Sequence, residues 1–481
     1  MALEHLEPKS VFHFFEEMCA IPHGSGNTKA VSDWCVRFAQ ERGLEYVQDA
    51  LNNIIIIAPA TPGYENAPAL ILQGHLDMVC ALGPDCAKDM AAEGLELFVE
   101  GDRIGARGTT LGGDDGIAVA MALAVLDDPG IPHPRLEALF TVDEETGMFG
   151  AHGLDPAPLQ GRTLLNLDSE EEGVFTVACA GGARVYLRWE LAQERCRALP
   201  LTLKVEGLLG GHSGVEIDKG RANANILMGR LLRELSKHTA LRLCALEGGT
   251  ADNAIPFACR AVAAVAPEDA DAVLAVVERC SAAFRKEFAF GDPELCLRAA
   301  LEPETELTVL TAAGTKQLLD ALTLVPNGIQ AMSHEIPGLP ETSLNLGQLS
   351  LQNGSGCMTF SVRSSVVSRK EKLIDRLSCV AEVTGAKVEI SGEYPAWEYR
   401  ADSPLRERMV RVFREQYGRE PQVVSIHAGL ECGLLAEKLP GLDCVSFGPD
   451  MLDIHTAQER MVIPSVQRVW SFLLEVLKQS K

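Results

Sequence analysis

The segment ALILQGHLDMV, residues 69–79, indicates the fold and suggests a site. Four of its first five residues are apolar, which is typical of a buried strand in a parallel sheet. Gly74 frees the backbone just before His75 and Asp77, so an imidazole and a carboxylate follow the carboxyl end of the strand, where ligands bind in open α/β sheets. A metal-bound imidazole needs an acceptor for its second ring nitrogen, so the pair is compatible with a metal site. A surface histidine beside an aspartate is the alternative.

Acidic residues follow two further predicted strands. Residues 136–142 run into Asp-Glu-Glu at 143–145, and residues 164–167 run into Asp-Ser-Glu-Glu-Glu at 168–172, while Gly-Gly-Asp-Asp at 112–115 opens an Ala-rich helix. Helix capping alone could explain the last pair, because each acid at a helix N-terminus is stabilised by about 0.3 to 1 kcal/mol. Many carboxylates at one sheet edge repel one another unless a cation offsets their charge. The pattern therefore favours a metal site over a solvated rim.

Length, charge and cysteine usage restrict the class of protein. A chain of 481 residues should form two or three domains. Its net charge of −24 disfavours nucleic acid and anionic membranes as partners. No run of about 18 apolar residues predicts a membrane span, and the first residues lack the basic start and apolar core of a secretory signal. The 14 cysteines form no CxxC pair, which favours reduced thiols, so we expect a cytoplasmic protein.

The expected fold class is α/β, with a catalytic domain in two segments, residues 1–184 and 394–481. Its mixed, largely parallel sheet should be flanked by helices, with residues 1–50 helical and residues 88–107 looping over the sheet edge. Residues 185–393 are expected to form an inserted α+β lid domain. Strands and helices in this insert repeat a β-α-β order weakly, which is compatible with two duplicated ferredoxin-like halves.

Eight blocks of sequence together resemble a known enzyme family. The blocks are GHLDMV (74–79), TTLGGDDGIAVAMA (109–122), TVDEETGMFGA (141–151), LNLDSEEEG (165–173), GGHSGVEI (210–217), TADNAIP (250–256), HAGLECGLL (427–435) and DIHTAQER (453–460). In this order they resemble the co-catalytic metallopeptidases that include aminoacylase, glutamate carboxypeptidase, peptidase T and carnosinase. The resemblance implies a phosphorylase/hydrolase-like zinc peptidase fold. It also implies a metal-dependent dipeptidase for short peptides, with Xaa-His dipeptides such as β-Ala-His and Gly-His as the expected substrates.

The resemblance implies two divalent metal ions, with zinc as first choice and cobalt or manganese as substitutes. The implied ligands are Asp114 as the bridge, His75 and Asp168 for one ion, and Glu145 and His455 for the other. Asp77 would orient the His75 ring. Glu144 would be the general base that takes a proton from the bridging water.

The resemblance also assigns residues that recognise the peptide. His212 would stabilise the oxyanion, with a turn-capping histidine as the alternative. Asn253 and Arg363 would lie near the substrate carboxylate as the inserted domain closes, although Arg363 could also be an outward strand residue. Gly429 would shape the pocket floor, and Glu431 could meet an amino terminus.

Two positions depart from the family pattern. Asp115 stands where relatives often have Asn or a small residue, and the sequence leaves open whether the Asp114–Asp115 peptide bond is cis, as in the family. Thr456-Ala457 follow His455, where Ser-Pro is common.

The insert is longer than one small α/β lid requires, so its second half is expected to replace a partner's lid. The chain would then act as a monomer or a homodimer.

Other functions are compatible with parts of this pattern. An N-acyl amino acid deacylase or a carboxypeptidase would use the same metal pair. A non-catalytic metal-binding interaction protein would be expected to have lost Glu144, Asp77 or a ligand, and all of them are present. A glycosidase would leave His75 and His455 without a role.

Overall fold

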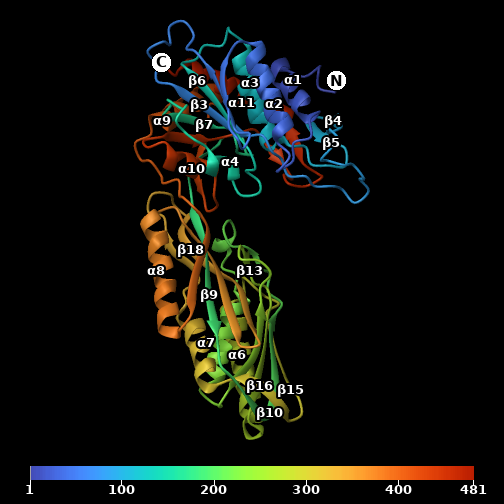
Figure 1. Ribbon diagram of the computed structural model, residues 1–481, viewed down its shortest axis with the longest axis vertical. Helices are drawn as coiled ribbons and strands as arrows, with labels where there is room; N and C mark the ends of the chain where they lie inside the picture. Colours follow the sequence, from blue (N-terminus) through green and yellow to red (C-terminus); the bar gives the residue numbers. More distant parts are fainter. Residues whose placement is uncertain (1) are drawn as a thin grey trace. The chain divides into compact units, whose positions relative to one another are not determined.

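The computed structural model describes residues 2–481, and the chain divides into two compact units. Unit 1 consists of Met1–Ala178, Tyr399–Ser425 and Leu430–Lys481, and unit 2 of Cys179–Glu398 and Ile426–Gly429. Figure 1 traces the chain through both units by colour. None of the described helices combines the length and apolar character needed to cross a bilayer.

Unit 1 is built on an eight-stranded mixed sheet. In spatial order its strands are β1 (Glu45–Gln48), β2 (Ile54–Ala58), β6 (Leu136–Thr141), β3 (Leu70–His75), β7 (Thr163–Asn166), β22 (Asp443–Ser446), β8 (Val174–Cys179) and β21 (Gln422–Ile426). The four neighbours β6, β3, β7 and β22 are parallel. Every residue of β3 and β6 is buried, as expected of central strands with covered faces. The predicted strands therefore end at one shared edge.

Helices cover both faces of this sheet. They are α1 (Lys9–Cys19), α2 (Lys29–Glu41), α3 (Gly113–Asp127), α4 (Phe149–Gly153), α9 (Pro404–Tyr417), α10 (Glu431–Lys438) and α11 (Ile463–Lys478). Helix α3 approaches β3 at Gly74, where an added Cβ would lie 2.5 Å from Asp115 Oδ2 and 2.7 Å from Ala118 Cβ. Successive strand residues face opposite sides, and Glu431 of α10 contacts the preceding residue, Gln73, from the other face.

Two predictions for unit 1 are wrong in detail. Residues 45–48 form strand β1 and not the end of a helix, because each of them pairs with a residue of β2. Residues 97–106 form a hairpin of β4 (Leu97–Glu100) and β5 (Arg103–Ala106) instead of a loop. This hairpin pairs with β24 (Arg460–Val462) and, through it, with β23 (Met451–Leu452) in a separate sheet.

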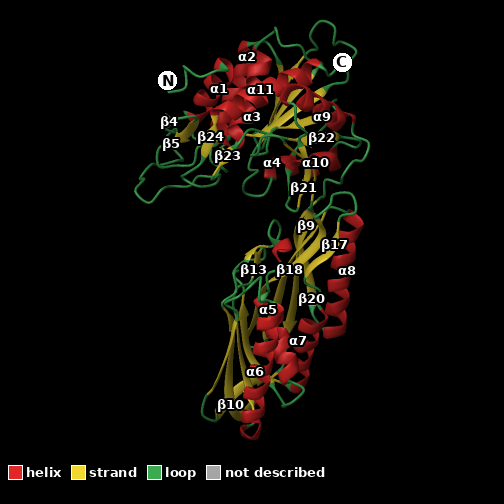
Figure 2. Cartoon of the chain, turned by 180° about the vertical axis from the view of Figure 1, so that it is seen from behind, coloured by secondary structure: helices red, strands yellow, loops and turns green. Residues whose placement is uncertain are grey.

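Unit 2 contains a ten-stranded antiparallel sheet. Its strands are β9 (Gly181–Glu190), β10 (Gln193–Glu206), β12 (Arg242–Gly248), β14 (Cys259–Val265), β15 (Cys296–Leu301), β16 (Thr305–Leu310), β17 (Gly328–Met332), β18 (Pro340–Gln352), β19 (Ser355–Ser364) and β20 (Lys387–Tyr394). Its helices are α5 (Ala224–Leu235), α6 (Ala270–Glu287), α7 (Ala312–Leu324) and α8 (Val367–Thr384), which pack in a row against the sheet (Figure 2).

The sheet of unit 2 consists of two halves with the same topology. The first half runs β10-α5-β12-β14-α6-β15 and has the spatial order β15-β10-β14-β12. The second uses β9, α7, β18, β19, α8 and β20 in the equivalent order, and β12 pairs with β18 to join the halves. Both are β-α-β-β-α-β units of ferredoxin-like type. The β-α-β repeat expected from the sequence is therefore present in the topology.

Candidate metal centre

Five side chains of the kinds that bind metals meet at the carboxyl edge of the sheet in unit 1. His75 ends β3, and Asp114 lies at the start of α3. Glu145, Asp168 and His455 lie in the segments that follow β6, β7 and β23, respectively. They form two overlapping groups that could each hold a metal ion, and Asp114 belongs to both. In each group the ligand atoms lie within 4.8 Å of one another.

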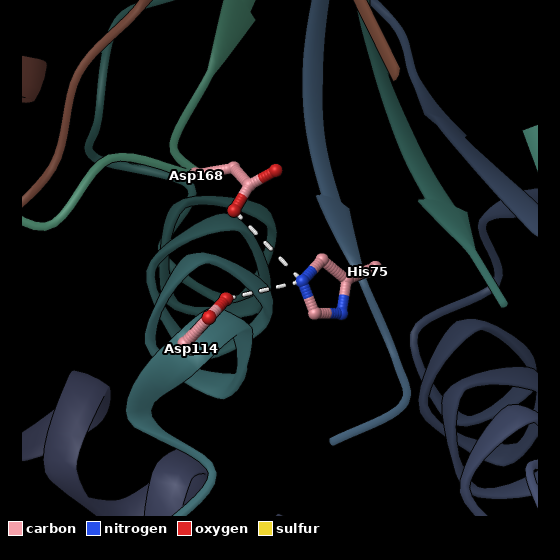
Figure 3. A group of neighbouring side chains, drawn as sticks. All are labelled: His75, Asp114 and Asp168. Carbon is pink, nitrogen blue, oxygen red and sulfur yellow. Dashed lines mark hydrogen bonds and ion pairs between the residues drawn. The ribbon is translucent and has the colours of Figure 1, made fainter. Parts of the chain in front are cut away.

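The two oxygens of Asp114 face different histidines. Oδ1 lies 3.1 Å from His75 Nε2, and Oδ2 lies 3.1 Å from His455 Nε2. Asp168 Oδ1 is 3.8 Å from the same nitrogen of His75 (Figure 3), and Glu145 Oε2 is 3.1 Å from that of His455. A carboxylate with one oxygen directed into each group is suited to bridge two cations. The peptide bond after Asp114 is cis, which the sequence left open.

Carboxylates and histidines this close together shift one another's pKa values. Burial, followed by repulsion from Asp115, raises the pKa of Asp168 well above its usual value. Hydrogen bonds with Asp114 and Glu145 raise the pKa of His455 to about 10. His455 therefore favours its protonated form beside these carboxylates, and a divalent cation would replace that proton. The donors, two imidazole nitrogens and three carboxylates, fit a pair of ions such as zinc.

Asp77 connects the His75 ring to the segment that carries Glu144. The closest acceptor to His75 Nδ1 is the main-chain carbonyl of Asp77 at 2.9 Å, whereas the Asp77 carboxylate lies 3.6 Å away. That carboxylate accepts hydrogen bonds from Ser25 Oγ at 2.8 Å and from the main-chain N–H groups of Glu144 and Glu145 at 3.0 and 3.4 Å. Asp77 can thus orient both the ring and the loop after β6.

The side chain of Glu144 makes no hydrogen bond or ion pair with any described residue. Burial, together with the charges of Glu145, Asp114 and Asp77, raises its pKa to about 7. A carboxylate with an unengaged side chain and a pKa near neutrality can accept and release a proton at physiological pH.

Glu431, which the resemblance suggested could meet a substrate amino terminus, contacts two neighbouring strands of unit 1. It is fully buried, and its Oε2 accepts hydrogen bonds from Gln73 Nε2 at 2.7 Å and Thr141 Oγ1 at 2.6 Å. Burial and the nearby Glu144 raise its pKa to about 8. Gln73 in turn accepts a hydrogen bond from Asn166 of β7. Glu431 therefore lies in a buried polar layer that links three strands beneath the metal cluster.

His212 lies in the short strand β11 (Gly211–His212), which pairs with β13 (Ala254–Ile255) in unit 2. Its Nδ1 accepts hydrogen bonds from the main-chain N–H groups of Gly214 and Val215, each at 3.2 Å, so in the neutral ring the proton is on Nε2. Burial and the charge of Arg363 lower the pKa of His212. A neutral ring with an Nε2–H group can donate a hydrogen bond to an oxyanion.

Arg363 is 8 % exposed, and its NH1 group donates a hydrogen bond to Tyr394 Oη at 2.9 Å. Its Nε is buried and has no hydrogen-bond partner among the described residues. Gly429 approaches the same tyrosine, since an added Cβ would lie 2.8 Å from Tyr394 Cε2. Asn253 is exposed, and its main-chain carbonyl accepts a hydrogen bond from Ser213 at 2.8 Å. Arg363 thus retains an unused donor that a carboxylate could take.

Two residues beside His212 and Arg363, His427 and Tyr394, were not among the site residues expected from the sequence. His427 is 5 % exposed, and its Nε2 is 2.7 Å from Ser343 Oγ. Burial, Arg363 and His212 lower the pKa of His427 to about 4, so it stays neutral. Two signals in the sequence pointed to His427: it directly follows the strand-like residues 423–426, and it begins the HAGLECGLL block. No pattern in the sequence indicated Tyr394.

The chain is similar to known peptidases in sequence and in fold. A profile of Peptidase family M20/M25/M40 matches residues 71–479. The chain is 36% identical over 481 residues to the Cytosol non-specific dipeptidase of Escherichia coli (strain K12), with 99% of each chain covered. It also matches the crystal structure of aminoacylhistidine dipeptidase from Vibrio alginolyticus with a TM-score of 0.95 and 35% identity, over 99% of this chain and 98% of that one.

A more distant match supports the fold alone. Aminopeptidase PepT from Bacillus cereus matches with a TM-score of 0.57 and 16% identity, with 99% of each chain covered. The metallopeptidase fold and class expected from the eight sequence blocks are thus confirmed. The chain belongs to peptidase family M20/M25/M40 and is a metallopeptidase similar to aminoacylhistidine dipeptidase.

Proposed function

We propose that this protein is a cytosolic two-metal dipeptidase that hydrolyses Xaa-His dipeptides such as β-Ala-His and Gly-His. The observation that carries the proposal is the arrangement of Asp114, whose two oxygens each lie 3.1 Å from a different histidine. The names of the two similar proteins, an aminoacylhistidine dipeptidase and a cytosol non-specific dipeptidase, support the substrate class and the compartment. The second name favours a broader range of dipeptides as the alternative.

In this proposal His75 and Asp168 would hold one ion, Glu145 and His455 would hold the other, and Asp114 would contribute to both. Zinc is the first choice because two imidazoles and three carboxylates suit it, and cobalt and manganese are the substitutes. Two such cations would lower the pKa of a water molecule between them and polarise the scissile carbonyl.

Glu144 is the proposed general base. Its carboxylate takes a proton from the attacking water and then transfers it to the nitrogen of the departing amine. The pKa of about 7 suits both steps, since the group is partly in each form at neutral pH. Asp77 positions this residue through the hydrogen bond from the main-chain N–H of Glu144.

The inserted segment, residues 185–393, is proposed to act as a lid that recognises the peptide. His212 would donate its Nε2–H to the oxyanion, and Arg363 would bind the substrate carboxylate through its unused Nε–H, with Asn253 and Gly429 nearby in the closed state. We propose that His212 acts within its own chain. Activity should then survive dilution that dissociates any dimer, and activity lost in step with dissociation would contradict this.

Metal analysis combined with substrate profiling tests the proposed function. The protein should contain two equivalents of zinc, cleave β-Ala-His and Gly-His, and lose activity on chelation. Other dipeptides measure the breadth of specificity, and N-acetyl amino acids test the deacylase alternative. Faster cleavage of N-acetyl amino acids than of dipeptides with a free α-amino group would favour a deacylase. Dipeptide cleavage that persists after complete removal of metal would refute the metal-dependent mechanism.

A further inference from the structure

The segment after His455 contains a buried carboxylate that the proposed reaction does not use. Glu459 is 2 % exposed and follows the histidine by four residues. It accepts hydrogen bonds from the main-chain N–H groups of four consecutive residues, Leu111 (2.7 Å), Gly112 (3.1 Å), Gly113 (2.8 Å) and Asp114 (3.5 Å). The last of these is the residue shared by both metal groups.

The N–H groups of Leu111 and Gly112 precede α3, and those of Gly113 and Asp114 begin it. The backbone of Asp114 is not yet helical, and N–H groups at such a helix start lack acceptors within the helix. The residue before α3, Gly112, has a φ of 67° and supplies no side-chain cap. Glu459 therefore takes the place of a cap, and charge-assisted hydrogen bonds of this kind are stronger than neutral ones. The Glu459 carboxylate packs closely against this backbone, since a Cβ added at Gly113 would lie 3.2 Å from Glu459 Oε1.

Glu459 thus ties together two segments that are far apart in the chain and each carry a metal-binding side chain. One segment begins α3 with Asp114, and the other contains His455, whose Nε2 lies 3.1 Å from Asp114 Oδ2. We propose that Glu459 is a positioning residue that fixes Asp114 relative to His455 and so sets the affinity of the metal group formed by Asp114, Glu145 and His455. The inference rests on the proposed two-metal function.

The chain offers a matched control in Glu137, another buried glutamate of unit 1. It is fully buried in β6, accepts hydrogen bonds from the main-chain N–H groups of Gln160 and Gly161, and pairs with Arg135. It lies toward the amino-terminal end of its strand, away from the edge where His75 pairs with Thr141. Replacing it removes a comparable set of contacts without touching the metal groups.

The experiment compares full-length wild type with Glu459→Gln, Glu459→Asp and Glu137→Gln. Each apo protein is titrated with cobalt while its visible absorption is recorded, its melting temperature is measured, and kcat and KM for Gly-His are determined. Glu459→Gln should weaken binding of one of the two cobalt ions by about 10- to 100-fold, the usual effect of losing a partner behind a metal ligand. Its kcat should fall with little change in KM. Glu459→Asp, which keeps the charge but shortens the reach, should fall between wild type and the glutamine variant.

Glu137→Gln should lower the melting temperature yet titrate cobalt like wild type. If both glutamine variants bind cobalt with wild-type affinity, Glu459 is only a structural cap and the inference is overturned. An aspartate variant with weaker cobalt binding than the glutamine variant would also contradict it, because the retained charge should help. Failure of the proposed function would instead be seen in the wild type, as a lack of the second cobalt ion or of peptidase activity.

Discussion

Lowering the pH from 7.5 to 5 should destabilise this protein in part through one histidine, His427. Burial, followed by the charges of Arg363 and His212, lowers its pKa to about 4, compared with about 6.5 in an unfolded chain. Between these values the unfolded state binds more protons than the folded state. The stability from the neutral ring is therefore fully present above about pH 6.5 and is lost as the pH falls toward 4.

The difference between the two pKa values corresponds to about 3 kcal/mol of the free energy of unfolding, of which about 2 kcal/mol is lost between pH 7.5 and 5. The test compares wild type with His427→Gln, which keeps a polar side chain beside Ser343, by urea unfolding followed through tryptophan fluorescence. Wild type should lose about 2 kcal/mol more than the variant over this interval. Replacing the exposed His238 by Gln is the control, and the stability of this variant should depend on pH in the same way as that of wild type. Equal pH dependence of wild type and His427→Gln would refute a buried neutral His427.

Three further predictions concern the residues around Arg363, the packing of the unit 1 sheet against α3, and the proposed metal ions. Tyr394→Phe removes the hydroxyl that is hydrogen-bonded to Arg363. KM for dipeptides should then rise about tenfold, equivalent to about 1.4 kcal/mol, with a smaller change in kcat. An unchanged KM would argue against Arg363 as the carboxylate-binding residue. Gly74→Ala places a methyl group 2.5 Å from Asp115 Oδ2 and should reduce the free energy of unfolding by about 1 to 3 kcal/mol, whereas an unchanged urea midpoint would contradict this packing. Removing the metal should lower the melting temperature in calorimetry, because a ligand that binds only the folded state stabilises it, and identical melting of both forms would argue against a bound cation.

The strands that carry the candidate ligands could be predicted from the sequence. The segments of β3 and β6 consist mainly of apolar residues because both faces of a central parallel strand are covered. Once these strands are taken as parallel neighbours, His75 and Glu145 must reach one edge. The apolar positions of Pro404–Tyr417 repeat at helical spacing, a pattern that indicates the helix found there as α9.

Other features depend on contacts that sequence patterns do not contain. Strand β1 has a half-exposed, partly polar sequence and is defined by its pairing with β2. Acids are mostly exposed in folded proteins, so the local sequence around Glu431 does not predict that it is buried. Its burial depends on Gln73 and Thr141, which are 358 and 290 residues away in the chain. Tyr394 likewise gains its place through Arg363, a partner 31 residues away on another strand.

Glu144→Gln provides the most direct test of the two-metal mechanism, with zinc content, KM and kcat measured on the same preparation. The substitution keeps the shape of the side chain and removes its ability to carry a proton. The variant should retain two equivalents of zinc and a KM near that of wild type, while kcat for β-Ala-His falls by about 10²- to 10⁴-fold. Dipeptide cleavage at the wild-type rate by the zinc-loaded variant would contradict the role of Glu144 and the mechanism built on it.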